Sequence, residues 1–116
     1  MVFNAVIGNT DDHLKNFWML QDRRGFRLSP AFDLVPDIGE RREHALAFLY
    51  GQRTPTRSDL LAIAKAWGVK RAGDILEQVL AAARGFRRVA KRLGVAAASV
   101  GEIGADIDTR RKCCGS

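Results

Sequence analysis

The sequence of 116 residues lacks several features that would define a class of protein on their own. Its two cysteines, Cys113 and Cys114, are adjacent, so they provide neither a disulfide framework nor a zinc site, and we expect them to belong to a frayed tail. No apolar run approaches the roughly 20 residues that a membrane-spanning helix needs. Internal repeats and low-complexity linkers are also missing. We therefore expect a cytoplasmic protein with no membrane partner.

Glycine-rich phosphate loops are missing as well. Neither G-x-G-x-x-G nor G-x-x-x-x-G-K-[ST] occurs in the chain, although it contains 11 glycines. Gly68-Val69-Lys70 superficially resembles the end of a lysine-bearing strand. It follows an apolar stripe at helical spacing, so Gly68 is better interpreted as a helix-terminating glycine. The chain therefore has no lid of its own for a nucleotide.

What the sequence does contain is a polar run near its N-terminus that folding alone does not require. Asp11 and Asn16 stand five positions apart, and Asp33 follows after a second predicted turn. A kinase catalytic loop supplies a base and a metal-binding amide at this spacing, and a further Asp on an aromatic-Asp turn completes the Mg²⁺ site. The pattern indicates a phosphoryl-transfer centre.

The chemistry of that reaction explains these residue types. A hydroxyl that attacks the γ-phosphate of ATP needs a carboxylate to orient it and accept its proton, and Asp11 is the candidate, with Asp12 next in line. Mg²⁺ prefers oxygen ligands, which Asn16 and Asp33 would supply. The alternative is structural, because Asn and Asp are common in turns, where they hydrogen-bond the local backbone. On that interpretation residues 9–12 are an ordinary loop that closes a helix.

The residues around this pattern resemble a known family. Residues 3–17 and 28–36 are similar to the C-terminal kinase lobe of HipA-type toxins, which are bacterial protein Ser/Thr kinases of toxin–antitoxin systems. The resemblance continues through residues 44–46 and 57–61 to the helical tail. It implies Asp11 as the catalytic residue, Asn16 and Asp33 as metal ligands, Mg²⁺ and ATP as cofactors, and a protein substrate.

Two residues inside the loop depart from the usual protein-kinase pattern. A Lys commonly stands two positions after the catalytic Asp and faces the phosphate, but here that position holds His13 and the lysine is Lys15. Either residue is a candidate for phosphate contact. Equally, His13 would pin the loop by hydrogen bonds and Lys15 would point into solvent.

The resemblance covers a lobe and not a whole kinase. A kinase also needs a β-rich lobe with a lid over the phosphates and a strand Lys paired to a helix Glu. We therefore expect a truncated or split kinase that is inactive alone and is completed by a missing N-terminal lobe or bound by an antitoxin. We also expect apolar surface to be exposed near residues 2–7 and the hairpin, which favours a homodimer.

The predicted fold is a single mainly α domain over residues 1–116, a protein-kinase-like C-lobe helical bundle with a short β-hairpin near residues 17–28. Residues 1–56 carry the catalytic loop, the hairpin and the aromatic-Asp segment, residues 57–110 form the helical bundle, and residues 111–116 form a tail. We predict that the hairpin brings Asp11, Asn16 and Asp33 together.

Smaller elements follow from local signals. In the first part we expect a helix over residues 2–7 that stops at Gly8 and a short extended segment at 45–50. In the second part, Thr56 or Ser58 begins a helix whose apolar stripe runs from Leu60 to Trp67. The remaining expected elements are a helix from about 71 divided at Gly85 and ended by Gly94, and a last helix over about 96–109.

Charge is divided unevenly between the two halves. Residues 1–58 hold eight Lys or Arg against seven Asp or Glu, whereas residues 59–116 hold eleven against six. A basic stripe can bind nucleic-acid phosphates, but it is more often a solvated face. The alternative function is thus a non-catalytic module that holds an antitoxin, a partner lobe or nucleic acid, although the resemblance implies DNA contact only indirectly through an antitoxin. The basic residues that recur at helical spacing in the second half are Arg84, Arg87, Arg88, Lys91 and Arg92.

Overall fold

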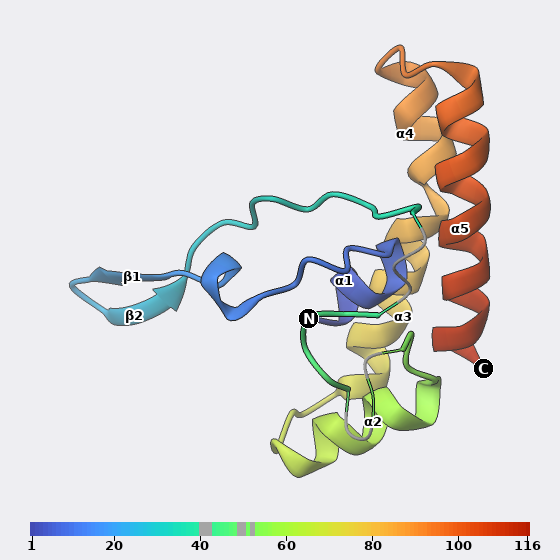
Figure 1. The fold of residues 1–116 in the computed structure, drawn as a ribbon. Helices are drawn as coiled ribbons and strands as arrows, with labels where there is room; N and C mark the ends of the chain where they lie inside the picture. The colour runs from blue at the N-terminus through green and yellow to red at the C-terminus, as the bar shows by residue number, and fades with distance from the viewer. Residues whose placement is uncertain (40–42, 49–50, 52) are drawn as a thin grey trace.

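The computed structural model describes residues 1–39, 43–48, 51 and 53–116. Across these residues the chain forms five α-helices, one 3-10 turn and one two-stranded antiparallel hairpin. The helices gather on one side of the molecule, and the hairpin projects away from them (Figure 1). The prediction of a mainly α fold with a short hairpin is therefore confirmed. No helix within the described ranges has the length and apolar character needed to cross a membrane.

Helix α1 (Val2–Ile7) is short but lies at the centre of the helical part. Its last four residues are buried, and it packs against helices α3 (Ala72–Arg84) and α5 (Ala97–Gly115). It ends at Gly8, whose φ of 75° is in the left-handed region that glycine tolerates. A Cβ on Gly8 would stand 2.6 Å from Arg110 Nε of α5, so the close approach of the two segments also requires glycine.

The hairpin follows the 3-10 turn η1 (Leu14–Asn16) and consists of β1 (Met19–Asp22) and β2 (Gly25–Leu28). The two-residue connection is stabilised at its start, because Asp22 Oδ1 accepts a hydrogen bond of 2.8 Å from the Arg24 N–H. All eight strand residues are exposed. The hairpin therefore stands out from the body of the protein without a layer against it among the described residues.

The helical half begins where the sequence predicts. Thr56 caps α2 (Arg57–Ala66) in a reciprocal capping box with Asp59, and hydrogen bonds from Thr56 hold the pKa of Asp59 below its usual value. Gly68, with a φ of 64°, follows the end of α2. Gly85 divides α3 from α4 (Phe86–Arg92), and Gly94 follows α4 with a φ of 76°. These local stop signals are confirmed.

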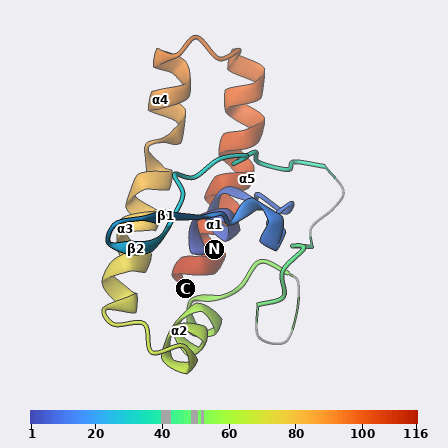
Figure 2. The same cartoon turned by 90° about the vertical axis from the view of Figure 1, so that its left-hand side faces the viewer.

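Helix α5 organises the core. It contacts α1, α2, α3 and α4, and Figure 2 shows it running from the end beside α4 down to the level where α2 begins. The core side chains come from α1, α2, α3, α5 and Phe48, so the core is built between segments that are far apart in the sequence. The buried core residues are Ala5, Val6, Phe48, Leu60, Leu76, Leu80, Ala83, Ile107 and Cys114.

The predicted tail at residues 111–116 is wrong, because α5 continues through Gly115. Cys114 is fully buried, and burial raises the pKa of its thiol to about 12. The Cys113 Sγ donates towards the backbone carbonyls of Thr54 and Pro55, each at 3.7 Å. The end of the chain is therefore packed structure, and both cysteines are free thiols.

Three other expectations need correction or restriction. Trp67, the last residue of the apolar stripe expected to face the core, is 82% exposed, because it stands at the C-cap where α2 ends and the chain turns away. Exposed apolar surface is predicted both near residues 2–7 and on the hairpin. The last four residues of α1 are buried, so of these two segments the hairpin is the one that exposes its large apolar side chains. The extended segment expected at 45–50 lies partly outside the described residues. In the described part, Phe48 pairs with Gly51 in one antiparallel bridge.

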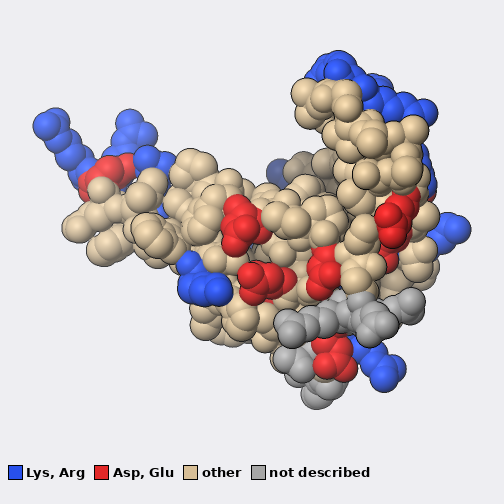
Figure 3. Space-filling model, turned by 45° about the horizontal axis from the view of Figure 1, so that its top comes forward, with Lys and Arg blue, Asp and Glu red and all other residues tan. Residues whose placement is uncertain are grey.

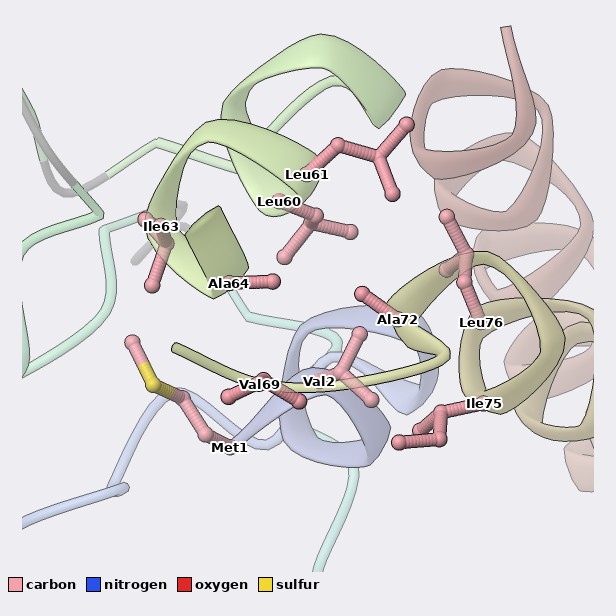
Figure 4. Close-up of a pocket in the computed structure, with 10 residues that line it drawn as sticks. All are labelled: Met1, Val2, Leu60, Leu61, Ile63, Ala64, Val69, Ala72, Ile75 and Leu76. Atoms are coloured by element: carbon pink, nitrogen blue, oxygen red, sulfur yellow. The ribbon is translucent and has the colours of Figure 1, made fainter. Parts of the chain in front are cut away.

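An apolar pocket of about 200 Å³ lies where α1, α2 and the start of α3 meet (Figure 4). Side chains from the three segments point towards one another there without filling the space. The pocket shows that this corner of the helical part is less tightly packed than the region around α5. Its lining residues are Met1, Val2, Leu60, Leu61, Ile63, Ala64, Val69, Ala72, Ile75 and Leu76.

Candidate functional site

The loop between α1 and η1 carries alternating buried and exposed polar residues. Asn9 and Thr10 are buried, Asp11 is exposed, and Asp12 is completely buried. The two neighbouring aspartates therefore point in opposite directions. Only Asp11 presents its carboxylate to a molecule arriving from solvent.

Asn16 connects the three residues that the sequence pattern singles out. Its Nδ2 donates a hydrogen bond of 2.9 Å to the Asp11 backbone carbonyl and another, at 3.5 Å, to Asp33 Oδ2. The hairpin makes this possible, because a hydrogen bond from the Ser29 N–H to the Trp18 carbonyl closes its base and returns the chain to η1. The structure thus places Asp11, Asn16 and Asp33 in one region.

Asp33 has a backbone conformation that is rare for a residue with a side chain. Its φ is 54°, in the left-handed region, where strain is tolerated when the surroundings fix it. Two contacts do so: Asn9 Nδ2 donates to the Asp33 carbonyl at 3.2 Å, and the ring of Phe32 packs edge-on against Trp18 with centroids 6.0 Å apart. The Asp33 carboxylate stays exposed beside Asn16.

The two departures from the usual kinase loop differ in their contacts. His13 Nε2 lies 3.4 Å from Asp11 Oδ1, and both side chains are more than half exposed. Lys15 extends an exposed side chain, whereas its backbone carbonyl accepts a hydrogen bond of 2.7 Å from Trp18 Nε1. His13 is therefore placed to orient the Asp11 carboxylate, and Lys15 fixes the base of the hairpin through its backbone.

Behind the loop, Asp12 forms a buried pair with His44. Asp12 Oδ2 lies 3.3 Å from His44 Nδ1, both side chains are fully buried, and Asp12 Oδ1 accepts a hydrogen bond of 3.1 Å from the Leu46 N–H. The Ala45 N–H donates to the Thr10 carbonyl at 2.9 Å. Burial lowers the pKa of His44, and the Asp12 carboxylate partly opposes that shift. Asp12 is thus a structural anchor of the loop, and its carboxylate faces away from solvent.

Further polar contacts hold the start of the loop and the neighbouring segments. Thr10 Oγ1 donates to Asp37 Oδ2 at 2.7 Å, and the Asp37 N–H donates to the Gly8 carbonyl at 2.8 Å. From α5, the largely buried Arg110 pairs with Asp106 at 2.7 Å and donates to Thr54 Oγ1 at 2.9 Å. Sequence reasoning missed the Thr10–Asp37 and Arg110–Thr54 contacts, because the partners are 27 and 56 positions apart and no local pattern links them.

The residues present fit a hard divalent cation with few protein ligands. Both contacts of Asn16 use Nδ2, so its amide oxygen remains available beside the exposed Asp33 carboxylate. One carboxylate and one amide, completed by phosphate and water, are a usual donor set for Mg²⁺. Within the described part of the chain, no group of three or more His, Cys, Asp or Glu side chains could hold a metal ion. A cation here would therefore depend on phosphate and water as further ligands.

A second pocket, of about 210 Å³, opens next to this site. It is formed between α1, the end of β2 and residues 30–34, and Asn16 contributes to its wall. Most of the lining is apolar. The arrangement therefore combines a polar edge at Asn16 with an apolar recess that can receive part of a larger ligand.

Comparison with known proteins agrees with the geometry. The family model of the HipA-like C-terminal domain matches residues 1–86. A protein of Sinorhizobium fredii (strain NBRC 101917 / NGR234) named "Putative kinase Y4mE" is 43% identical over 37 residues, which make up 32% of this chain and 9% of that protein. No solved structure matches the chain. The match over residues 1–86 includes the loop, the hairpin and Asp33, and the chain belongs to the HipA-like C-terminal domain family.

Proposed function

We propose that this chain provides the catalytic lobe of a HipA-like protein Ser/Thr kinase of a toxin–antitoxin system. The reaction is transfer of the γ-phosphoryl group of ATP to a protein hydroxyl. The observation that carries this proposal is Asn16, which hydrogen-bonds both the Asp11 backbone and the Asp33 carboxylate. Those three residues stand in the order and spacing of a kinase base and its two metal ligands.

Asp11 serves as the base in this proposal. Its carboxylate is exposed, and the buried Asp12 next to it anchors the loop, so an acceptor hydroxyl can approach Asp11 from solvent. Asp11 would orient that hydroxyl and accept its proton as the oxygen attacks phosphorus. His13, 3.4 Å from Asp11 Oδ1, would fix the direction of the carboxylate.

Asn16 and Asp33 would hold Mg²⁺ through one amide oxygen and one carboxylate. When bound, the cation neutralises negative charge on the phosphate oxygens of ATP. The contacts that fix the Asp33 backbone in its left-handed conformation keep the carboxylate beside Asn16 before any ligand arrives. Such preorganisation lowers the cost of assembling the site.

The proposed kinase needs a further lobe to close over the nucleotide. Neither phosphate-loop motif occurs in the sequence, and the segment aligned with the Sinorhizobium fredii protein covers 9% of that protein. The exposed apolar residues of the hairpin and the recess beside Asn16 form the surface on which that lobe and the nucleotide would meet this chain. An antitoxin is the expected regulatory partner, and the cytoplasm the expected location.

The test is a chimera in which this chain is fused to the N-terminal part of the Sinorhizobium fredii relative. We expect Mg²⁺-dependent transfer of the γ-phosphoryl group of labelled ATP to protein, and little ATP binding by this chain alone. Asp11→Asn should reduce the transfer rate about 10²–10⁴-fold, whereas ATP affinity stays close to that of the unsubstituted chimera.

Asp22→Asn is the matched control, because Asp22 is also an exposed carboxylate but lies at the hairpin turn. It should leave the rate unchanged. If the Asp11→Asn chimera binds ATP and transfers phosphate as fast as the unsubstituted chimera, the assignment of Asp11 as the base is overturned.

A further inference from the structure

The stretch of sequence that contains α4 carries positive charge without an acidic residue of its own. The chain has 13 Asp and Glu, or about one in nine residues, yet none occurs between Glu77 and Glu102. Five Lys and Arg fall within this interval. A solvated surface helix usually mixes charges of both signs along its face. The excess of one sign makes this stretch complementary to a negatively charged partner.

One of the five basic residues has a structural role. Arg87 pairs with Asp108 of α5 and lies so close to Gly104 that a Cβ there would stand 2.7 Å from Arg87 Nε. Arg111 also pairs with Asp108, at 2.8 Å. Arg87 is thus used to join α4 to α5, and its charge is neutralised within the fold.

The other four basic residues are exposed and, among the described residues, have no ion-pair partner. Arg84 ends α3, directly before the division at Gly85, and the other three belong to α4. At 3.6 residues per turn, the three side chains of α4 lie within an arc of about 100°. Ala90, on another side of α4, is buried. We call these residues the basic stripe: Arg84, Arg88, Lys91 and Arg92.

The basic stripe lies on a part of the molecule that a large partner can reach. Figure 1 shows α4 and the start of α5 extending beyond the rest of the helical part, away from the hairpin. In Figure 3, Lys and Arg atoms gather over this end of the molecule, whereas the acidic atoms in this view lie over the middle, the lower part and the projecting hairpin. The family match ends at Phe86, so three of the four residues lie beyond it.

We propose that the basic stripe binds the phosphate backbone of a duplex nucleic acid, independently of base sequence and without an antitoxin as intermediary. From Arg84 to Arg92 the stripe is about 12 Å long, and a duplex carries one phosphate per strand every 3.4 Å or so. Three to four phosphates of one strand therefore fall opposite the stripe. Three of its members are arginines, whose planar guanidinium groups bind phosphate oxygens in pairs.

The surroundings of the stripe favour a duplex over the other anionic partners. Single strands are usually held by aromatic side chains on which the bases stack, and the aromatic residue of α4, Phe86, is packed against the core. Membrane-surface helices insert a broad apolar face. The seven-residue α4 directs Ala90 into the protein, and Val89 is its one exposed large apolar side chain, which is too little for such a face. The proposal does not depend on the kinase function.

The experiment measures binding of the full chain to fluorescent DNA and RNA duplexes of mixed sequence by anisotropy, over a range of salt. With about four phosphate contacts, the affinity should fall about 100-fold between 50 and 200 mM salt, whereas one remaining contact would give about 4-fold. The triple variant Arg84→Gln, Arg88→Gln, Arg92→Gln should show this weaker dependence and bind much less tightly at low salt. Its melting temperature should be unchanged, because all three side chains are exposed.

The matched control is Arg23→Gln, Arg24→Gln, Lys65→Gln, which removes the same charge from exposed positions on the hairpin turn and α2. It should keep the salt dependence of the unsubstituted chain. Equal losses in both triple variants would overturn the proposal, because net charge alone would then explain binding. So would tighter binding to single strands than to duplexes, or stripe-dependent binding to phosphatidylserine vesicles without duplex binding.

Discussion

The hairpin and the helical part are both rich in large apolar residues, but the helical part buries these side chains and the hairpin exposes them. Leu76 and Leu80 of α3 are 2% and 5% exposed, whereas Phe26 and Leu28 of β2 are 70% and 61% exposed. The helices place their apolar stripes against α1 and α5, but the hairpin has no second layer among the described residues. A two-stranded ribbon is marginal in water without such a layer. The hairpin is therefore suited to meet another surface.

The candidate site lies at the boundary between these two regions. Asp12 faces the packed part and contacts His44 and the Leu46 N–H. Asp11 and Asp33 face solvent next to the hairpin. The residue that anchors the loop therefore faces the packed helices, whereas the residues proposed for the chemistry face solvent. Single substitutions can separate the two roles.

The largest effect is expected in the packed region. Leu76→Ala should lower the free energy of unfolding by about 2–5 kcal/mol, because it removes a buried core side chain and enlarges the pocket between α1, α2 and α3. Urea denaturation would measure this. The matched hairpin variant Leu20→Ala should stay within about 0.5 kcal/mol, and equal losses would mean that the hairpin is packed in solution.

The two aspartates of the loop should differ next. Asp12→Ala removes the acceptor of the Leu46 N–H and the partner of His44, which should cost about 1–3 kcal/mol of stability. Asp11→Ala removes an exposed side chain and should change stability little. The same urea experiment compares them, and a smaller loss for Asp12→Ala than for Asp11→Ala would contradict the anchoring role.

The buried His44 should make stability depend on pH. Its pKa is lowered in the folded state, so between that value and its ordinary pKa near 6.5 the unfolded chain binds a proton that the folded chain does not. Stability should be fully present above about pH 6.5 and decrease as the pH falls. Thermal melts at a series of pH values would show this. His44→Gln should flatten the dependence, and an unchanged slope would assign it to other groups.

We expect the smallest effect on stability for a substitution on the exposed face of the hairpin. Phe26→Ser should leave the free energy of unfolding within about 0.5 kcal/mol, because the ring is 70% exposed. The same change removes apolar surface that favours association. Light scattering should therefore show less self-association of the variant, and a clear loss of stability would show that Phe26 packs within its own chain.

Much of the fold could be predicted because its signals are local. The positive φ angles at Gly8, Gly68 and Gly94 and the Thr56 cap depend on residues within a few positions of each element end. The spacing of Asp11 and Asn16 is local as well. That local information was sufficient to place the end of α1, the start of α2 and the end of α4, and to select the loop.

What could not be predicted depends on contacts between distant segments. The burial of Cys114 and the Arg110–Thr54 hydrogen bond keep α5 helical to Gly115, yet the sequence there has the composition of a tail. Likewise, His44 pairs with Asp12 across 32 positions. Trp67 continues an apolar stripe beyond the point where α2 ends, so periodicity alone wrongly assigned it to the core.

Whether Asn16 and Asp33 hold a divalent cation is tested most directly by a titration of the chain with Mn²⁺, a paramagnetic substitute for Mg²⁺, followed by NMR. If Asn16 and Asp33 share a cation beside Asp11, the amide signals of these three residues should broaden at the lowest Mn²⁺ concentrations, before those of the exposed Asp22 and Asp74. Asp33→Asn should remove that preference. Equal broadening at all exposed carboxylates, or a preference that survives Asp33→Asn, would contradict the account.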